Sequence, residues 1–198
     1  MPTTKTITVY TIDELTPKAK EKALDKMREI FETDYEFIEQ DVSEYLKNLG
    51  YGDVEISFSG FYSQGDGASF VTKNGVDILQ WFAHQPVNVK ASFPLTVKYL
   101  ESQGINANIY RIDNHYSHEN TISAQVNQDD NLDDNEIQNA LDAELNKLEE
   151  LIKADARQES KYIYKMFKDY YEADTTDEMM VENATNNEYT FDEYGNLA

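Results

Sequence analysis

A long helical repeat occupies the last third of this chain. Apolar residues recur every three or four positions between Asp133 and Tyr171, which is the period of one face of an α-helix. An unbroken helix over this range would span roughly 55–60 Å at about 1.5 Å per residue. Its apolar stripe thins to alanine over 154–160, so a break is expected there. A helix with one apolar face needs other elements to cover that face.

Helix signals also occur near the N-terminus. Thr16 is a natural N-cap and Pro17 a natural first helical residue, which predicts a helix from Thr16 to Phe31. A second helix is expected from Tyr35 to Leu49, and Gly50 supplies its stop. Two shorter helices are expected over 94–102 and 176–184.

Alternating apolar and polar residues indicate strands in the middle of the chain. The predicted strands cover 53–59, 68–72, 105–112 and 121–126, and a further alternation covers 6–10. The segment 188–197 predicts a terminal hairpin or strand with a turn near 193–195. Residues 76–82 remain unassigned, and an irregular or edge region that includes 87–89 is expected between Pro86 and Pro94.

The order of these elements predicts an α+β fold in which helices cover an antiparallel sheet. The length of 198 residues suits a single domain over 1–198. Within that domain we expect a helical part over 14–49, a strand-rich part over 53–126 and a helical acidic part over 133–184.

The chain is strongly acidic, with 38 Asp and Glu against 17 Lys and Arg and a net charge of −21. This charge opposes direct binding to nucleic acid or to an anionic membrane, because both require an excess of cations. Cysteine is absent, which removes disulfides and thiolate chemistry and fits a reducing cytoplasm. No apolar stretch approaches the roughly 20 residues of a spanning helix, and the start lacks a signal-peptide core.

Most of the negative charge lies in two blocks, 129–151 and 172–198, which flank a mildly basic segment. Side by side, two such blocks would present a field comparable to that of DNA, so we expect them to bind a basic partner protein. The predicted partner-binding residues are Asp129, Asp130, Asp133, Asp134, Glu136, Glu144, Glu149, Glu150, Asp174, Asp177, Glu178 and Glu182. Solvated helix faces are the plain alternative interpretation of both blocks.

Residues 129–136 also begin like a calcium loop. The match fails because Asp134 replaces the glycine of position six and Ala140 replaces the glutamate of position twelve. The segment therefore predicts a helix N-terminus, with Asp133 and Glu136 in capping-box spacing. No metal, cofactor or catalytic residue is predicted.

A second hypothesis places a small-ligand or nucleotide site, or an enzyme site, on two turns. The predicted ligand residues are Gln64, Asp66, His115, Tyr116 and His118. Glycines on both sides of Asp66 bring main-chain N–H groups close to a ligand, and two imidazoles three residues apart reach one phosphate from a loop. The plain alternative is a hairpin turn in which Asp66 bonds its own backbone, beside histidines that cap backbone groups.

A basic row recurs every four residues on the long helix, at Lys153, Arg157, Lys161 and Lys165, with Lys168 nearby. It predicts either a contact with phosphate or with an acidic patch of a partner, or a structural role in which the row complements the negative end of the helix and pairs with the acidic tail after 171.

Three segments together carry a resemblance: 14–23 (ELTPKAKEKA), 58–70 (FSGFYSQGDGASF) and 115–121 (HYSHENT). With the closing 189–195 (YTFDEYG), they resemble a family of poorly characterised bacteriophage and mobile-element proteins whose distinctive motif is Ser-Gln-Gly-Asp-Gly. The resemblance implies an accessory protein in the cytoplasm of an infected bacterium that acts against host defence. With the acidity, it favours an inhibitor that mimics DNA charge and occupies the nucleic-acid-binding surface of a host protein.

Overall fold

The computed structural model describes residues 8–113 and 115–198, which group into two compact units. Unit 1 contains the described residues up to Asp34 together with 169–198, and unit 2 runs from Tyr35 to Lys168. Each unit has its own hydrophobic core. The fold is α+β, as predicted, whereas a single domain over 1–198 stays a prediction.

Unit 1 is built on the helices α1 (Pro17–Ile30) and α7 (Asp177–Asn186), with the short 3-10 helix η1 (Ile12–Glu14) before them. Both helices were predicted, and both begin at a threonine cap. Thr16 accepts a hydrogen bond from the Ala19 N–H at 3.4 Å, and Thr176 accepts one from the Met179 N–H at 3.3 Å. The core between the helices consists of Ile12, Leu15, Ala19, Ala23, Leu24, Met27, Met180, Ala184 and Phe191.

The C-terminal segment of unit 1 folds back as a tight turn. Phe191 forms antiparallel bridges with both Tyr10 and Leu197. The Asp192 side chain accepts hydrogen bonds from the N–H groups of Tyr194 and Asn196, both at 2.9 Å. The predicted terminal turn is therefore confirmed. Of the alternation predicted over 6–10, residues 6 and 7 lie outside the described residues.

Unit 2 contains four strands in two antiparallel pairs. Strand β1 (Val54–Ser59) pairs with β2 (Gly67–Thr72), and β3 (Asn106–Arg111) pairs with β4 (Ile122–Asn127). The four predicted strands in 53–126 are thus confirmed. The two pairs remain separate sheets because β2 meets β3 through a side chain: the Thr72 hydroxyl accepts from the Ile109 N–H at 3.0 Å.

Two of the helices in unit 2 were not predicted from the sequence. Helix α2 (Glu36–Asn48) and helix α5 (Pro94–Tyr99) follow the prediction. Helix α3 (Ile78–His84) occupies the unassigned segment and starts where the Asp77 carboxylate accepts from the Gln80 N–H at 2.9 Å. Helix α4 (Val87–Ala91) replaces the expected irregular or edge region, and Pro86 stands at its N-cap. These two helices are too short to show a helical period.

Gly50 ends α2 and allows α3 to approach. Its φ angle is +97°, in the left-handed region that favours glycine. A Cβ atom at this position would lie 2.6 Å from the backbone nitrogen of Trp81. The predicted stop signal is confirmed, and the close approach explains why glycine is needed there.

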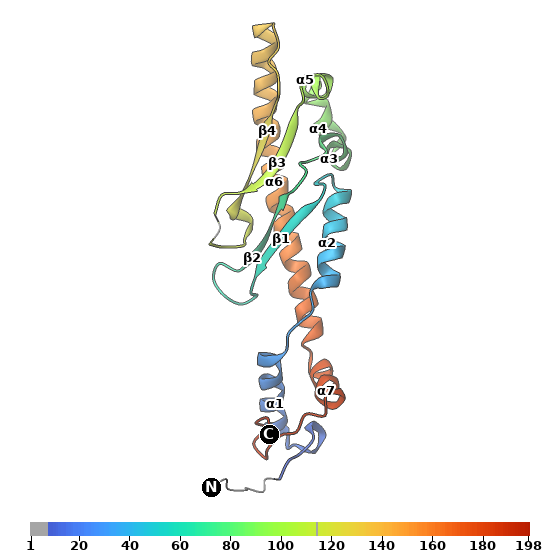
Figure 1. The fold of residues 1–198 in the computed structure, drawn as a ribbon, viewed down its shortest axis with the longest axis vertical. Coiled ribbons are helices and arrows are strands. Elements are labelled where there is room, and N and C mark those ends of the chain that lie inside the picture. Colours follow the sequence, from blue (N-terminus) through green and yellow to red (C-terminus); the bar gives the residue numbers. More distant parts are fainter. Residues whose placement is uncertain (1–7, 114) are drawn as a thin grey trace, which may run out of the picture. The chain divides into compact units, whose positions relative to one another are not determined.

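Helix α6 (Asn135–Asp174) is continuous, so the break expected over 154–160 is absent. Two small residues in this stretch, Ala156 and Ser160, are fully buried. The Ser160 hydroxyl donates to the Ala156 carbonyl at 2.8 Å, which satisfies its buried polar group within the helix. Figure 1 shows the part of α6 in unit 2 running along the four strands. Its buried stripe is Leu141, Leu145, Leu148, Ile152, Ala156, Ser160, Ile163 and Phe167.

Side chains of α6 close the outer edge of β4. Glu149 accepts a hydrogen bond from the Val126 N–H at 3.0 Å, and Arg157 donates one to the Ile122 carbonyl at 3.0 Å. Main-chain groups on an open strand edge otherwise invite pairing with another chain. Within the described ranges, no helix is both long and apolar enough to cross a membrane.

Candidate functional site

The predicted acidic block at the start of α6 is the first candidate site. Asp129, Asp130, Asp133 and Glu136 are all exposed, and none of them forms a salt bridge with any residue that the structure describes. We call these four residues the carboxylate cluster. They fall within eight positions that contain no cation. The cluster is therefore a surface of uncompensated negative charge.

Asp134, in the same segment, serves the helix itself. Its carboxylate accepts hydrogen bonds from the N–H groups of Glu136 at 2.9 Å and Ile137 at 3.2 Å. The expected cap was Asp133, so the prediction is wrong by one residue because α6 begins at Asn135 and not at Asp134. An anionic side chain here also faces the positive end of the helix dipole.

Three other predicted partner-binding acids are occupied within unit 2. Glu144 accepts from the backbone N–H groups of Leu95 and Thr96 and so caps α5. Glu149 closes the β4 edge, and Glu150 forms a salt bridge of 2.5 Å with Lys153. Their carboxylates hold the chain's own structure, which a charge count cannot reveal.

The basic row on α6 is also paired internally. Arg157 donates to the backbone of β4, and Lys153 pairs with Glu150. Lys161 lies 3.7 Å from the Glu119 carboxylate, and the Lys168 ammonium stands over the ring of Tyr62. These contacts favour a structural role for the row, although the carboxylates in these two salt bridges, Glu150 and Glu119, precede the predicted acidic tail.

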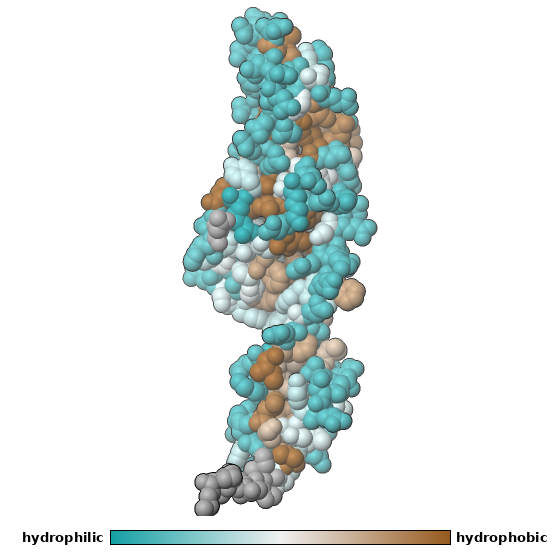
Figure 2. Space-filling view, viewed as in Figure 1, coloured by the Kyte–Doolittle hydropathy of each residue, from teal (hydrophilic) through white to brown (hydrophobic). Residues whose placement is uncertain are grey.

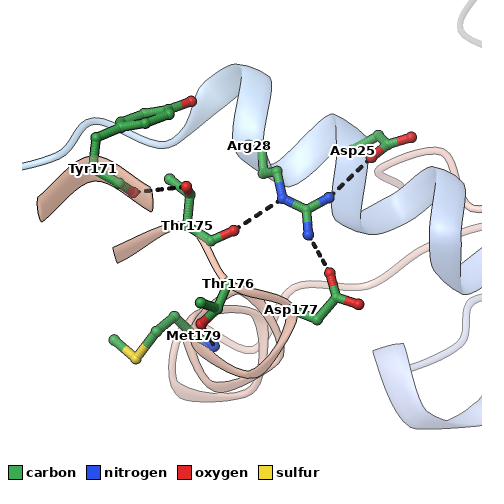
Figure 3. A network of polar contacts seen from close by, with 7 residues as sticks. All are labelled: Asp25, Arg28, Tyr171, Thr175, Thr176, Asp177 and Met179. Atoms are coloured by element: carbon green, nitrogen blue, oxygen red, sulfur yellow. Dashed lines mark hydrogen bonds and ion pairs between the residues drawn. The ribbon is translucent and has the colours of Figure 1, made fainter. Parts of the chain in front are cut away.

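The predicted acids of the second block lie in unit 1, around a contact network centred on Arg28 (Figure 3). The Arg28 guanidinium donates to the Thr175 carbonyl at 3.0 Å and pairs with Asp25 at 2.9 Å and with Asp177. The Thr175 hydroxyl donates to the Tyr171 carbonyl at 2.7 Å. This network joins α1 to the segment before α7. Asp177 is therefore neutralised, and Asp174 lies half-buried close by in the sequence.

A groove of about 640 Å³ lies between α1 and α7. Pro17, Leu24 and Val181 supply its apolar lining. Its margins carry the exposed carboxylates of Glu21, Glu178 and Glu182, the last two of which were predicted partner-binding residues. We call this groove the α1–α7 groove. Figure 2 shows that the visible face of unit 1 carries both apolar and hydrophilic surface.

The Gly-rich turn and the histidine turn meet, as the small-ligand hypothesis requires. A Cβ atom on Gly67 would overlap the Cβ of His118, and one on Gly65 would lie 3.3 Å from the ring of Tyr116. The contact joins the β1–β2 connection to the β3–β4 connection, which are about fifty residues apart in the sequence.

Several predicted ligand groups in these turns have structural partners. The Asp66 carboxylate accepts from the N–H groups of Tyr62 at 2.9 Å and Ser63 at 2.6 Å. His118 Nδ1 accepts from the Asn120 N–H at 3.1 Å. Gln64 and His115 are exposed, and in the described part of the chain no group of three or more potential ligands could hold a metal ion.

A polar cluster that was not predicted from the sequence lies beneath α2 and α3. Asp155 on α6 accepts hydrogen bonds from the Tyr51 hydroxyl at 2.7 Å, Trp81 Nε1 at 2.8 Å and Gln85 at 3.3 Å. One turn further on, Glu159 accepts from the Tyr45 hydroxyl at 2.6 Å. The only sequence signal was two carboxylates four residues apart on an amphipathic helix.

The environment of this cluster shifts its titration. Burial raises the pKa of Tyr51, and the negative charge of Asp155 raises it further. Burial also raises the pKa of Glu159, although the hydrogen bond from Tyr45 opposes that rise. Tyr51 and Trp81 are at most 1% exposed, so their donors have no access to water. The arrangement is therefore a structural anchor for α2 and α3 on α6.

Comparison with known proteins gives one match. A family model described as "Domain of unknown function (DUF8835)" matches residues 34–177. The matched range contains all of unit 2, while α1 and nearly all of α7 lie outside it. No curated protein and no solved structure matches the chain.

Proposed function

The chain belongs to the DUF8835 family, whose function is unknown, and we propose that it binds a basic partner protein through the carboxylate cluster. The observation that carries this proposal is the exposure of four uncompensated carboxylates within eight residues. Salt screens such interactions over a Debye length of about 10 Å at 0.1 M. Binding is therefore expected at low salt and is expected to weaken as salt rises.

The proposed partner is a nucleic-acid-binding defence protein of an infected bacterium, which the chain inhibits by covering its basic surface. The resemblance to bacteriophage proteins supports this choice of host. Even consecutive residues lie about 3.8 Å apart along the chain, whereas duplex DNA carries one charge per about 1.7 Å of its axis. The cluster alone is thus sparser than DNA, and additional carboxylates must contribute for close mimicry.

The test is affinity purification from a bacterial lysate at low and high salt, with mass spectrometry of the retained proteins. The cluster variant carries Asp129→Asn, Asp130→Asn, Asp133→Asn and Glu136→Gln. A matched control removes four exposed charges elsewhere in unit 2, through Glu39→Gln, Asp41→Asn, Glu44→Gln and Glu55→Gln. Wild type and control are expected to retain a nucleic-acid-binding protein that high salt or excess duplex DNA displaces. Equal retention by the cluster variant, or retention insensitive to salt, would refute the proposal.

The negative charge of the cluster also interacts favourably with the positive end of the α6 helix dipole. Its neutralisation is therefore expected to lower the stability of the α6 N-terminus. Of the cluster, only Glu136 lies in the first turn of α6, where a charge contributes about 0.3–1 kcal/mol. Circular dichroism of the variant must therefore show a folded protein at the temperature of the pull-down. If the folded variant no longer binds, the loss is due to the missing charges of the carboxylate cluster and not to unfolding.

The meeting of the two turns favours a second candidate function, a small-ligand or nucleotide site. Because Asp66 and His118 hold backbone groups, the exposed Gln64, His115 and Tyr116 are the residues through which a ligand would bind. The test is mass spectrometry of small molecules extracted from the purified protein. Gln64→Ala with His115→Ala is expected to abolish co-purification, and unchanged co-purification by this folded variant would exclude the site.

A further inference from the structure

We propose that the α1–α7 groove binds a basic amphipathic helix of a partner protein. This goes beyond the proposed function, because the carboxylate cluster lies in unit 2 and can bind a partner while the groove is empty.

The dimensions of the groove suit a helix. Its α1 wall runs from Pro17 to Arg28, which is about 17 Å at 1.5 Å per residue. A helical segment of about eleven residues, or three turns, matches this length. The volume of about 640 Å³ also lies within the range of about 300–1,000 Å³ that is typical of binding pockets. Two helical walls with apolar residues between them form the kind of groove that receives the apolar face of a third helix.

The lining requires an apolar stripe on the occupant. Pro17 is exposed and Val181 is half-buried, so both offer apolar surface to a partner, and Leu24 lies beneath them. A helix that covers this surface needs apolar residues at positions i, i+3, i+4 and i+7.

The margins require cations on the flanks of that helix. Glu21, Glu178 and Glu182 are exposed and form no salt bridge within the described residues. The two cations at the groove are already paired, Lys20 with Asp13 and Arg28 with Asp25 and Asp177. Glu178 and Glu182 are also like charges four residues apart, an arrangement that disfavours a helix until a cation lies between them.

The experiment measures binding of a fluorescein-labelled synthetic peptide of about fourteen residues by fluorescence anisotropy. The peptide has leucine at the i, i+3, i+4 and i+7 positions and lysine on both flanks. Two control peptides keep its charge: one has the leucines changed to serine, and the other has the same composition in scrambled order. Saturable binding of the first peptide is expected, with at least tenfold weaker binding of both controls. Equal binding of the scrambled peptide would show a charge-only contact and overturn the proposal.

Protein variants locate the contact. Glu178→Gln with Glu182→Gln is expected to raise the peptide Kd about fivefold, whereas the control pair Glu39→Gln with Glu44→Gln on α2 leaves it unchanged. Equal effects of the two pairs would overturn the proposal. Neutralisation of the carboxylate cluster is expected to leave peptide binding unchanged, so failure of the groove and failure of the proposed function are measured separately.

Discussion

Substitution Asp155→Ala tests the polar cluster beneath α2 and α3 most directly. The change removes the acceptor for the Tyr51 hydroxyl and Trp81 Nε1, both of which are excluded from water. A buried donor left without a partner costs about 1–3 kcal/mol. Because two such donors are left, we expect the free energy of unfolding of unit 2 to fall by about 2–6 kcal/mol. The less tightly bound Gln85 is expected to turn to solvent.

A double-mutant cycle isolates the cause of this loss. In a Tyr51→Phe background only Trp81 remains without an acceptor, so Asp155→Ala is expected to cost about 1–3 kcal/mol less than in the wild type. The control Asp142→Ala removes an exposed carboxylate from the same helix and is expected to change stability by no more than about 0.5 kcal/mol.

Urea unfolding followed by tryptophan fluorescence suits this measurement, because Trp81 is the only tryptophan in the chain and lies inside the cluster. The reasoning is refuted if Asp155→Ala costs less than about 1 kcal/mol, or if its cost is the same in both backgrounds. In either case the hydrogen bonds would not be the source of the anchoring.

Three further predictions concern single side chains. Since the folded-state pKa of Glu159 is raised above the ordinary value of 4.5, its contribution to stability is present below that value and is lost as pH rises through the raised pKa. The melting temperature of the Glu159→Gln variant is therefore expected to fall less than that of the wild type as pH rises. An equal fall in both proteins would contradict this prediction. Gly50→Ala places a side chain at a left-handed φ and against Trp81, so urea unfolding is expected to show a loss of about 2 kcal/mol or more. Thr176→Ala removes the cap of α7 and is expected to cost about 1 kcal/mol, measured as faster hydrogen exchange in α7 and not in α2.

Local chemistry accounts for the elements that the sequence predicted well. Thr16 followed by Pro17 defines the start of α1, and Gly50 defines the end of α2, because caps and stops depend on a few neighbouring residues. Helices α3 and α4 were missed because seven and five residues are too few to establish a helical period. Periodicity also misplaced a break in α6, since Ala156 and Ser160 continue its buried face with small side chains.

The candidate site was less predictable because its contacts join distant parts of the chain. Tyr51 and Asp155 are 104 positions apart, and Thr96 and Glu144 are 48 apart. A sequence read along its length shows that Glu144 is charged, but not that its carboxylate caps α5. The meeting of the Gly-rich and histidine turns was expected only as a condition of one hypothesis.

The closure of β4 by α6 has a consequence for self-association. Glu149 and Arg157 occupy main-chain groups at the two ends of the outer edge, Val126 and Ile122, and leave only Ala124 between them. A single residue is too short a template for an incoming strand, so this edge cannot seed stepwise growth from one molecule to the next. Two charged side chains of α6 thus cover the edge of β4 in place of a further strand. Substitution of either Glu149 or Arg157 is expected to cause self-association of the protein that increases with its concentration.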